Sequence, residues 1–291
     1  MAPFLTPNQL AKTLDYLASK QCANGGFCTY RMEYLEEPNP RDTFLAVASF
    51  QRVGEAVPHS ERVYAYLEKI LSDLKATFFS SLDSFAKAYS TTAFNYLYFP
   101  FATLKCLGKL QLDDFWQEVF ANLKIRLPDQ SHAYQSSLSR QLLLQKVRTQ
   151  KLAGPVPDRQ QIIDFTLSLK HHGSFGRNPN LLSTCWGLCL LNELDYDLSP
   201  MNDTRAYIQQ LQAPQTGFIL TTNGLLTNLE VVYAGILSSF LLQMDIPYLD
   251  AALRFVRMCQ MDRGGFAPMP VGLPNIENTY RALTVFSLTA G

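Results

Sequence analysis

The sequence predicts an all-α protein, an α/α toroid (a six-hairpin α6–α6 barrel) built from six helical-hairpin repeats of about 48 residues. Three observations predict this fold. A short frame of residues recurs along the chain, apolar residues recur at helical spacing, and period-two alternation flanked by hairpin turns is scarce. We expect residues 1–291 to form a single α/α-toroid domain.

The recurring frame has an aromatic residue near a helix end, Gln or Lys five positions later, and a glycine turn closed by Phe. The last two intervals between closing Phe residues are 43 and 48 residues, and the first is 148, which leaves room for two degenerate copies. The four clear copies run from Tyr16 through Gln21 to Phe27, from Phe165 through Lys170 to Phe175, from Tyr207 through Gln212 to Phe218, and from Phe255 through Gln260 to Phe266.

Each repeat pairs a half-buried outer helix with an apolar inner helix. Thr6 and Pro7 open the first outer helix, because Thr caps free N–H groups and Pro is tolerated at the first helical position. Its inner partner runs through 43–50. The remaining pairs are 61–75 with 91–107 (where we expect Pro100 to cause a kink), 113–125 with 134–147, 159–169 with 181–194, 203–211 with 227–242, and 249–259 with 277–288.

The final helix decides between an open and a closed arrangement of these repeats. An open solenoid ends in polar capping helices, whereas the helix at 277–288 is as apolar as the middle ones. The sequence therefore favours a closed ring, in which the sixth repeat packs on the first.

Composition excludes several classes of protein. The chain is 47% hydrophobic and 17% charged, and 25 basic residues balance 25 acidic ones, so the basic excess of a nucleic-acid-binding protein is missing. No apolar run approaches the ~20 residues of a membrane span. The six cysteines form no CxxC pair, and no signal peptide opens the chain, so we expect buried thiols in the reducing cytoplasm.

The frame, repeated around a ring of six hairpins, resembles the repeat shared by protein prenyltransferase β-subunits and squalene/terpene cyclases. The resemblance covers the whole chain in architecture and about half of it in motif, and it implies an apolar cavity where the inner helices begin. We interpret the frame residues as structural: Gly permits a positive φ, Phe fills the seam between repeats, and Gln bonds backbone groups at an adjacent helix end.

The zinc-binding set of the prenyltransferases is broken in this chain. That family holds zinc with Asp-x-Cys at one inner-helix start and His at the next, and the matching positions here are Asn228, Glu230 and Asn278. Asn is a poor zinc ligand, and Cys185 and Cys189 share a helix face without a third ligand. We therefore expect no resident cofactor: zinc would need another ligand set, and Mg²⁺ would arrive only with a diphosphate substrate.

The acid motif of the protonating cyclases, Asp-x-Asp-Asp-Thr, is broken as well. Its counterpart runs from Asn39 to Thr43, with Arg41 in the place of the proton donor, and arginine does not donate a proton at neutral pH. Asp42 is either an acid in an altered arrangement or the cap of the inner helix.

The candidate catalytic residues are therefore Asp42 and Glu230. Aromatic faces stabilise carbocations and arginine binds diphosphate, so the side chains near the inner-helix starts are candidate substrate-binding residues. Glu230 and Glu277 are also candidate salt-bridge partners of Arg281, which would need no ligand. The substrate-binding candidates are Arg41, Tyr89, Trp186, Tyr233, Tyr280 and Arg281.

Three functions stay open at this point. The first is a prenyltransferase-like or terpene-cyclase-like enzyme that acts on an isoprenoid or similar apolar small molecule by prenyl transfer or cyclisation. The alternative is a non-catalytic toroid that binds a lipid or a partner protein. A third, weaker reading is a subunit that is active only beside a partner subunit. We expect no nucleic acid among its partners.

Overall fold

A computed structural model describes residues 5–31, 35–80, 91–122, 137–176 and 178–290, together with positions 125 and 127. Twelve helices and four two-residue strands lie in these ranges, which confirms the all-α prediction. The chain divides into two compact units, and each is described by itself. The first comprises Met1–Gln111, Gln260–Ala267 and Val271–Ser287, and the second comprises Leu112–Cys259, Pro268–Pro270 and Leu288–Gly291.

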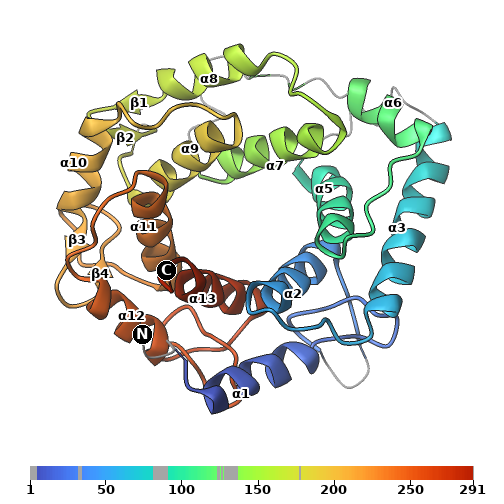
Figure 1. Ribbon diagram of the computed structural model, residues 1–291, viewed down its shortest axis with the longest axis horizontal. Helices are drawn as coiled ribbons and strands as arrows, with labels where there is room; N and C mark the ends of the chain where they lie inside the picture. Colours follow the sequence, from blue (N-terminus) through green and yellow to red (C-terminus); the bar gives the residue numbers. More distant parts are fainter. Residues whose placement is uncertain are drawn as a thin grey trace. The chain divides into compact units, whose positions relative to one another are not determined.

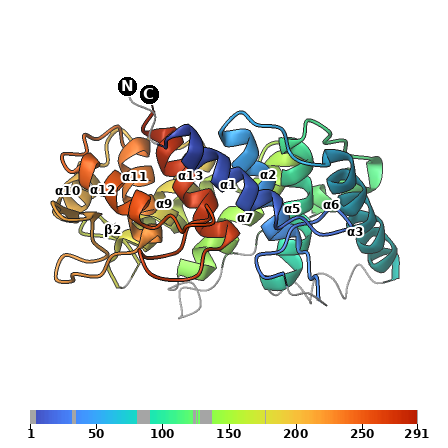
Figure 2. The same ribbon diagram turned by 90° about the horizontal axis from the view of Figure 1, so that it is seen from below.

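The first unit holds the helices of the first two repeats and nearly all of the final helix. Within it, α5 packs against both α2 and α3 (Figures 1 and 2). Pro100 lies inside α5, which continues past it. The helices are α1 (Pro7–Ala18), α2 (Pro40–Arg52), α3 (Ser60–Ser80), α5 (Thr91–Cys106) and α13 (Ile276–Leu288).

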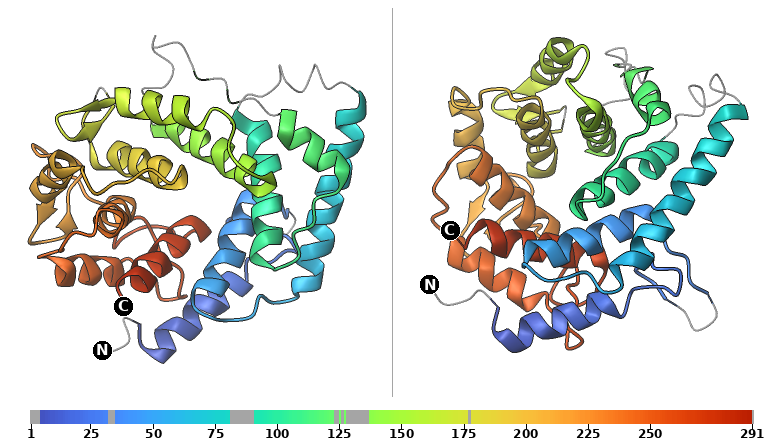
Figure 3. Two further views of the ribbon diagram at one scale, coloured as in Figure 1. Left: turned by 45° about the horizontal axis from the view of Figure 1, so that its top comes forward. Right: turned by 45° about the vertical axis from the view of Figure 1, so that its right-hand side comes forward.

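The second unit is built around α9, which packs against α7 and α11 (Figure 3). Two small antiparallel sheets, β1 with β2 and β3 with β4, connect its helices. Its elements are α6 (Asp114–Asn122), α7 (Ser137–Ala153), α8 (Arg159–Ser168), β1 (Lys170–His171), β2 (Ser174–Phe175), α9 (Leu181–Glu193), α10 (Asn202–Gln210), β3 (Gln212–Ala213), β4 (Gly217–Phe218), α11 (Leu229–Leu241) and α12 (Leu249–Met258).

Two predicted helices continue further than expected. The helix predicted at 61–75 continues to Ser80 as α3. The helix predicted at 134–147 continues to Ala153 as α7. Gly154, with φ near +154°, and the following Pro155 stop it, because neither residue continues a helix readily. Residues 134–136 lie outside the described residues. No helix in the described ranges combines the length and apolar character that a membrane crossing needs.

The recurring frame folds as a tight hairpin in all four copies. The Gln or Lys of the frame pairs with the closing Phe as antiparallel β-structure, whereas the sequence predicted a glycine turn without strands. The pairs are Gln21 with Phe27, Lys170 with Phe175, Gln212 with Phe218, and Gln260 with Phe266.

The glycine at the tip of each hairpin lets it approach the next outer helix closely. Gly25 has φ +95°, and a Cβ atom there would lie 2.3 Å from the backbone of Arg62 in α3. Gly264 has φ +94°, and a Cβ atom there would lie 2.0 Å from the carbonyl oxygen of Lys12 in α1. The sixth hairpin therefore contacts α1 as the first contacts α3, which is the contact that a cyclic order of repeats requires.

The frame glutamines bond backbone carbonyls of the following outer helix, as predicted. Gln21 donates its side-chain N–H to the carbonyl of Pro58, just before α3, at 2.9 Å. Gln260 donates to the carbonyl of Gln9, in the first turn of α1, at 3.0 Å. These bonds confirm the structural interpretation of the frame.

Candidate functional site

The inner helices begin with a shared local structure. Asn39 caps α2 by accepting the N–H of Asp42 at 2.8 Å, and the Thr43 hydroxyl accepts the N–H of Phe27 at 3.0 Å. These two bonds fix the start of α2 to the hairpin before it, and the starts of α9 and α13 make the same two bonds. The sequence signal for this structure is an Asn followed four residues later by a Thr, and sequence reasoning missed it. The same motif recurs as Asn180 with Thr184 and as Asn275 with Thr279. At the start of α11, Asn228 is followed by Val232 in place of Thr.

Partly exposed side chains recur along one face of several inner helices, whereas the side chains described in α5 from Leu97 to Leu104 are all buried. In the first unit, Arg41 and Phe44 of α2 and Tyr280 of α13 occupy such positions, whereas most of their neighbours are buried. The spacing of three to four residues marks a single helix face. All described candidate residues except Asp42 have this partial exposure, and Tyr89 lies outside the described residues. The others are Trp186, Glu230, Tyr233 and Arg281.

A charge cluster joins the starts of α2 and α13, which lie side by side in the first unit (Figure 1). Nη2 of Arg41 lies 2.5 Å from Oε1 of Glu277, and Nη2 of Arg281 lies 2.8 Å from the same oxygen. Arg281 also donates to Oδ1 of Asn278 at 3.3 Å. The predicted pairing of Glu277 with Arg281 is confirmed, and Arg41 is an additional member that sequence reasoning did not anticipate.

Asp42 lies in a different setting from its neighbour Arg41. Its side chain is buried, and its carboxylate accepts the N–H of Thr29 at 2.8 Å. The cap of α2 is Asn39, so the predicted capping role of Asp42 is wrong. Asp42 instead holds the residue after Cys28 against the first turn of α2. Its predicted role as an acid stays a prediction.

Aromatic side chains accompany the charge cluster in the first unit. The ring of Phe44, one turn beyond Arg41 on α2, lies 6.1 Å from that of Tyr98 and 5.6 Å from that of Phe99 on α5. The guanidinium of Arg52 lies 5.7 Å from the ring centre of Tyr280. The stripe thus places cationic and aromatic groups on adjacent turns.

Partly exposed aromatic side chains also lie on inner helices of the second unit. Trp186 of α9 and Tyr233 of α11 are half-buried, and Glu230 occupies the second position of α11, where α13 has Glu277. Cys185 and Cys189 are both buried, as expected for core thiols. The hydrogen bond with Cys189, together with burial, raises the pKa of the Cys185 thiol.

The positions that match the zinc ligands of the prenyltransferases do not fit that metal. Oδ1 of Asn228 accepts the N–H of Val231 at 2.9 Å, and Oδ1 of Asn278 accepts from Arg281. Neither position offers a thiolate or an imidazole. Across the described ranges, no three His, Cys, Asp or Glu side chains converge as a metal site would require.

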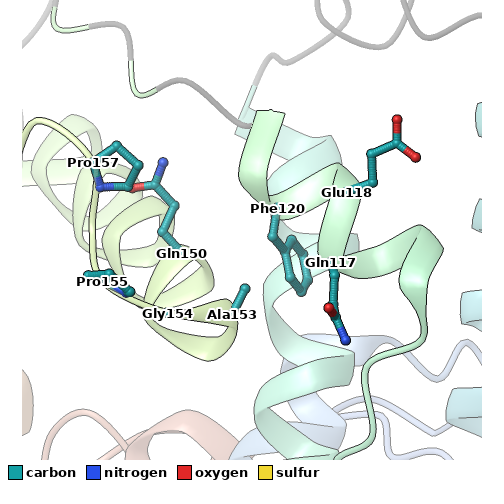
Figure 4. Close-up of a pocket in the computed structure, with 8 residues that line it drawn as sticks. All are labelled: Gln117, Glu118, Phe120, Gln150, Ala153, Gly154, Pro155 and Pro157. Atoms are coloured by element: carbon teal, nitrogen blue, oxygen red, sulfur yellow. The ribbon is translucent and has the colours of Figure 1, made fainter.

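A groove of about 550 Å³ lies elsewhere in the second unit, between α6 and the end of α7 (Figure 4). Phe120 and Ala153 face it from opposite helices. It lies at the C-terminal end of α7, away from the start of that inner helix, and none of the candidate residues lines it.

The comparisons with known proteins agree with this architecture. A model of the prenyltransferase alpha-alpha toroid domain matches residues 4–71 and 59–290. Protein geranylgeranyltransferase-I of Candida albicans, solved in complex with geranylgeranyl diphosphate (GGPP), has a similar fold, with a TM-score of 0.62 and 12% identity over 86% of this chain and 83% of that chain. No curated protein matches. The α/α-toroid prediction is confirmed.

Proposed function

This chain belongs to the prenyltransferase alpha-alpha toroid family, and on that premise we propose that it binds an isoprenoid diphosphate. In this proposal Arg41 and Arg281 hold the diphosphate, and the apolar chain lies against aromatic side chains of the inner-helix stripes. The observation that carries the proposal is the cluster of two arginines around one carboxylate, Glu277. A relative in fold was solved with a ligand of this class, GGPP.

The charges of the cluster favour an anion. The guanidinium groups of Arg41 and Arg281 and the carboxylate of Glu277 together carry a net charge of +1. Arg52, the last residue of α2, lies over the ring of Tyr280. Arg41 lies in the first turn of α2, where the helix dipole also favours negative charge. Arginine is suited to phosphate groups because its planar fork donates two parallel hydrogen bonds.

The neighbouring side chains suit an apolar chain. Phe44 lies one turn along α2 from Arg41 and packs on Tyr98 and Phe99, which are buried. Burial of apolar surface contributes about 25 cal/mol per Å², so a long isoprenoid chain gains affinity along such a stripe. In the second unit, Trp186 and Tyr233 offer the same type of surface.

If the protein is an enzyme, the proposed reaction is prenyl transfer or cyclisation. Asp42 and Glu230 are its candidate catalytic residues, and Mg²⁺ would enter with the diphosphate. The proposed reaction does not use zinc, because Asn228 and Asn278 do not fit that metal.

The alternative is a non-catalytic toroid that binds a lipid or a partner protein. Asn39 and Asn228 favour this alternative. Each asparagine stands where the related enzymes have an aspartate, and its side-chain oxygen accepts a backbone N–H as a helix cap.

Calorimetric titration with GGPP and with geranylgeraniol, the alcohol without a diphosphate, tests the proposal. We expect GGPP to bind at least about tenfold more tightly, because the alcohol lacks charge-assisted bonds to Arg41 and Arg281. Folded protein that binds neither ligand, or both equally, contradicts it. Pyrophosphate release from GGPP in Mg²⁺ buffer then decides between the two forms: release supports the enzyme, and binding without release supports the non-catalytic alternative.

A further inference from the structure

We propose that Cys22 and Cys28 are an oxidisable dithiol that closes to a disulfide across the first hairpin. Their sulfur atoms lie 3.2 Å apart, and both side chains are buried, with 4% and 3% exposed. Neither cysteine is among the proposed ligand-binding residues, so the inference goes beyond the proposed function.

The backbone of the hairpin brings the two thiols together. Cys22 donates its N–H to the carbonyl of Gly26 at 2.7 Å, and Cys28 donates its N–H to the carbonyl of Lys20 at 3.1 Å. The two cysteines thus follow the paired residues Gln21 and Phe27, and their side chains share the opposite face of the hairpin. A disulfide needs a further approach of the sulfur atoms to about 2.05 Å.

The other hairpins show that the fold itself does not require cysteines here. The corresponding positions hold Ala213 and Ile219 in the fifth repeat, and Met261 and Ala267 in the sixth. Those hairpins make the same Gln–Phe pairing without thiols. The paired cysteines are therefore particular to the first repeat.

The first hairpin is linked to the start of α2. Phe27 bonds the Thr43 hydroxyl, and Thr29, next to Cys28, donates its N–H to Asp42. A disulfide between Cys22 and Cys28 would fix the segment that supports this turn of α2. Arg41 lies in the same turn, so oxidation would reduce the mobility of the backbone that positions Arg41.

Thiol–disulfide exchange with glutathione disulfide would form the bond. The thiolate of one cysteine attacks a glutathione sulfur, the glutathione S–S bond breaks, and one glutathione thiolate leaves and takes up a proton. The second cysteine then attacks the mixed disulfide and releases the second glutathione, so two protein thiols are oxidised and one glutathione disulfide is reduced. Burial and the bond to Cys28 raise the pKa of Cys22 to about 12, so the exchange is slow and needs transient opening of the hairpin.

Mass spectrometry after incubation with glutathione disulfide tests the proposal. Trypsin releases both cysteines in one peptide, from Gln21 to Arg31. We expect this peptide to lose two hydrogens and to resist alkylation, and the melting temperature to rise by roughly 5 °C, because the bond closes a short loop in the unfolded chain. Full alkylation of both thiols, or a mixed glutathione disulfide that does not close, overturns the proposal.

Two variants sharpen the assignment. Cys22→Ser should trap one glutathione on Cys28 and abolish the rise in melting temperature. Cys185→Ser is the matched control, because Cys185 and Cys189 form the other close thiol pair and lie one turn apart on α9. It should leave the two-hydrogen loss of the Gln21–Arg31 peptide intact. If Cys185→Ser removes the thermal shift and Cys22→Ser does not, the proposal is wrong.

Discussion

The guanidinium of Arg41 lies 2.5 Å from the carboxylate of Glu277, although 236 positions separate the two residues in the chain. Arg281, on the turn after Glu277, contacts the same carboxylate oxygen at 2.8 Å. The carboxylate of Glu277 therefore contacts a guanidinium group from each of the two helix starts, α2 and α13. The shared carboxylate lowers the repulsion between the two guanidinium groups, and the two arginines still outnumber it.

Replacing the shared carboxylate should strengthen the binding of anions. Glu277→Gln raises the net charge of the cluster by one and removes a group that competes for both guanidiniums. We expect the affinity for inorganic pyrophosphate to rise roughly threefold to tenfold at low salt, and the gain to shrink at high salt. Calorimetric titration measures it.

The matched control for this change is Glu193→Gln. Glu193 pairs with Arg148 at 2.7 Å, but it lies at the C-terminal end of α9. That variant should leave pyrophosphate affinity unchanged. An unchanged or lower affinity in Glu277→Gln would show that the cluster is a structural salt bridge only.

The contact between the sixth hairpin and α1 should depend on the absence of a side chain at Gly264. Gly264→Ala places a Cβ atom 2.0 Å from the carbonyl oxygen of Lys12 and forces a positive φ on alanine. The left-handed conformation alone costs about 1–2 kcal/mol, and the overlap adds to it. Urea unfolding measures the loss.

Gly54→Ala is the control that measures the cost of a positive φ at alanine without the steric overlap. Gly54 also has a positive φ, +76°, but a Cβ atom there would meet no described atom within 4 Å. Gly54→Ala should therefore lose only the free energy of unfolding that the left-handed backbone conformation of alanine costs. Equal losses in the two variants would mean that the approach of the hairpin to α1 contributes nothing to stability.

Removing the hydroxyl of Thr43 should lower the stability of the folded protein. Thr43→Val keeps the shape of the side chain but leaves the buried N–H of Phe27 without its acceptor. Such a change costs about 1–3 kcal/mol. Thermal unfolding of this variant should be compared with that of Thr166→Val, whose hydroxyl donates to the carbonyl of Ile162 within α8. A smaller loss at Thr43 than at Thr166 would contradict the role of the Asn-x3-Thr motif.

Stability at high pH should depend on Tyr207. Burial raises the pKa of its hydroxyl from 10.0 to about 12. Between these values the unfolded chain has lost a proton that the folded chain retains, so the free energy of unfolding falls as pH rises from 10 to 12.

Tyr207→Phe removes this contribution. Since the hydroxyl is buried and has no hydrogen-bond partner among the described residues, the variant should be at least as stable as the wild type at pH 8. Its stability should also decline less steeply from pH 10 to pH 12, as followed by urea unfolding at each pH. An equal decline in both proteins would exclude Tyr207 as the source.

The repeat could be predicted from sequence because each copy is a local structure. Gly25 and Gly264 permit a turn that few other residues adopt, and the closing Phe must be buried, so both leave a visible pattern. The paired strands were missed because two residues are too few to show alternation. The stop of α7 at Gly154 was missed because the apolar periodicity fades before the helix ends.

The candidate site was less accessible to sequence reasoning. The pair of Glu277 and Arg281 is spaced by one helical turn and could be predicted locally. The contact of Arg41 with Glu277 arises from the packing of α2 beside α13, and no local spacing indicates it. Asp42 resembled a catalytic acid by motif, but its bond to Thr29 depends on how the hairpin folds back on α2.

In the proposed complex, Arg41 and Arg281 hold the diphosphate of an isoprenoid ligand. Calorimetric titration of GGPP against the double variant Arg41→Gln with Arg281→Gln tests it most directly. Arg205→Gln is the control, since Arg205 bonds the carbonyl of Leu242 at the end of α11. We predict that GGPP binds the double variant roughly 10- to 100-fold more weakly than it binds the wild type or the control. Equal affinity in all three folded proteins would contradict the claim.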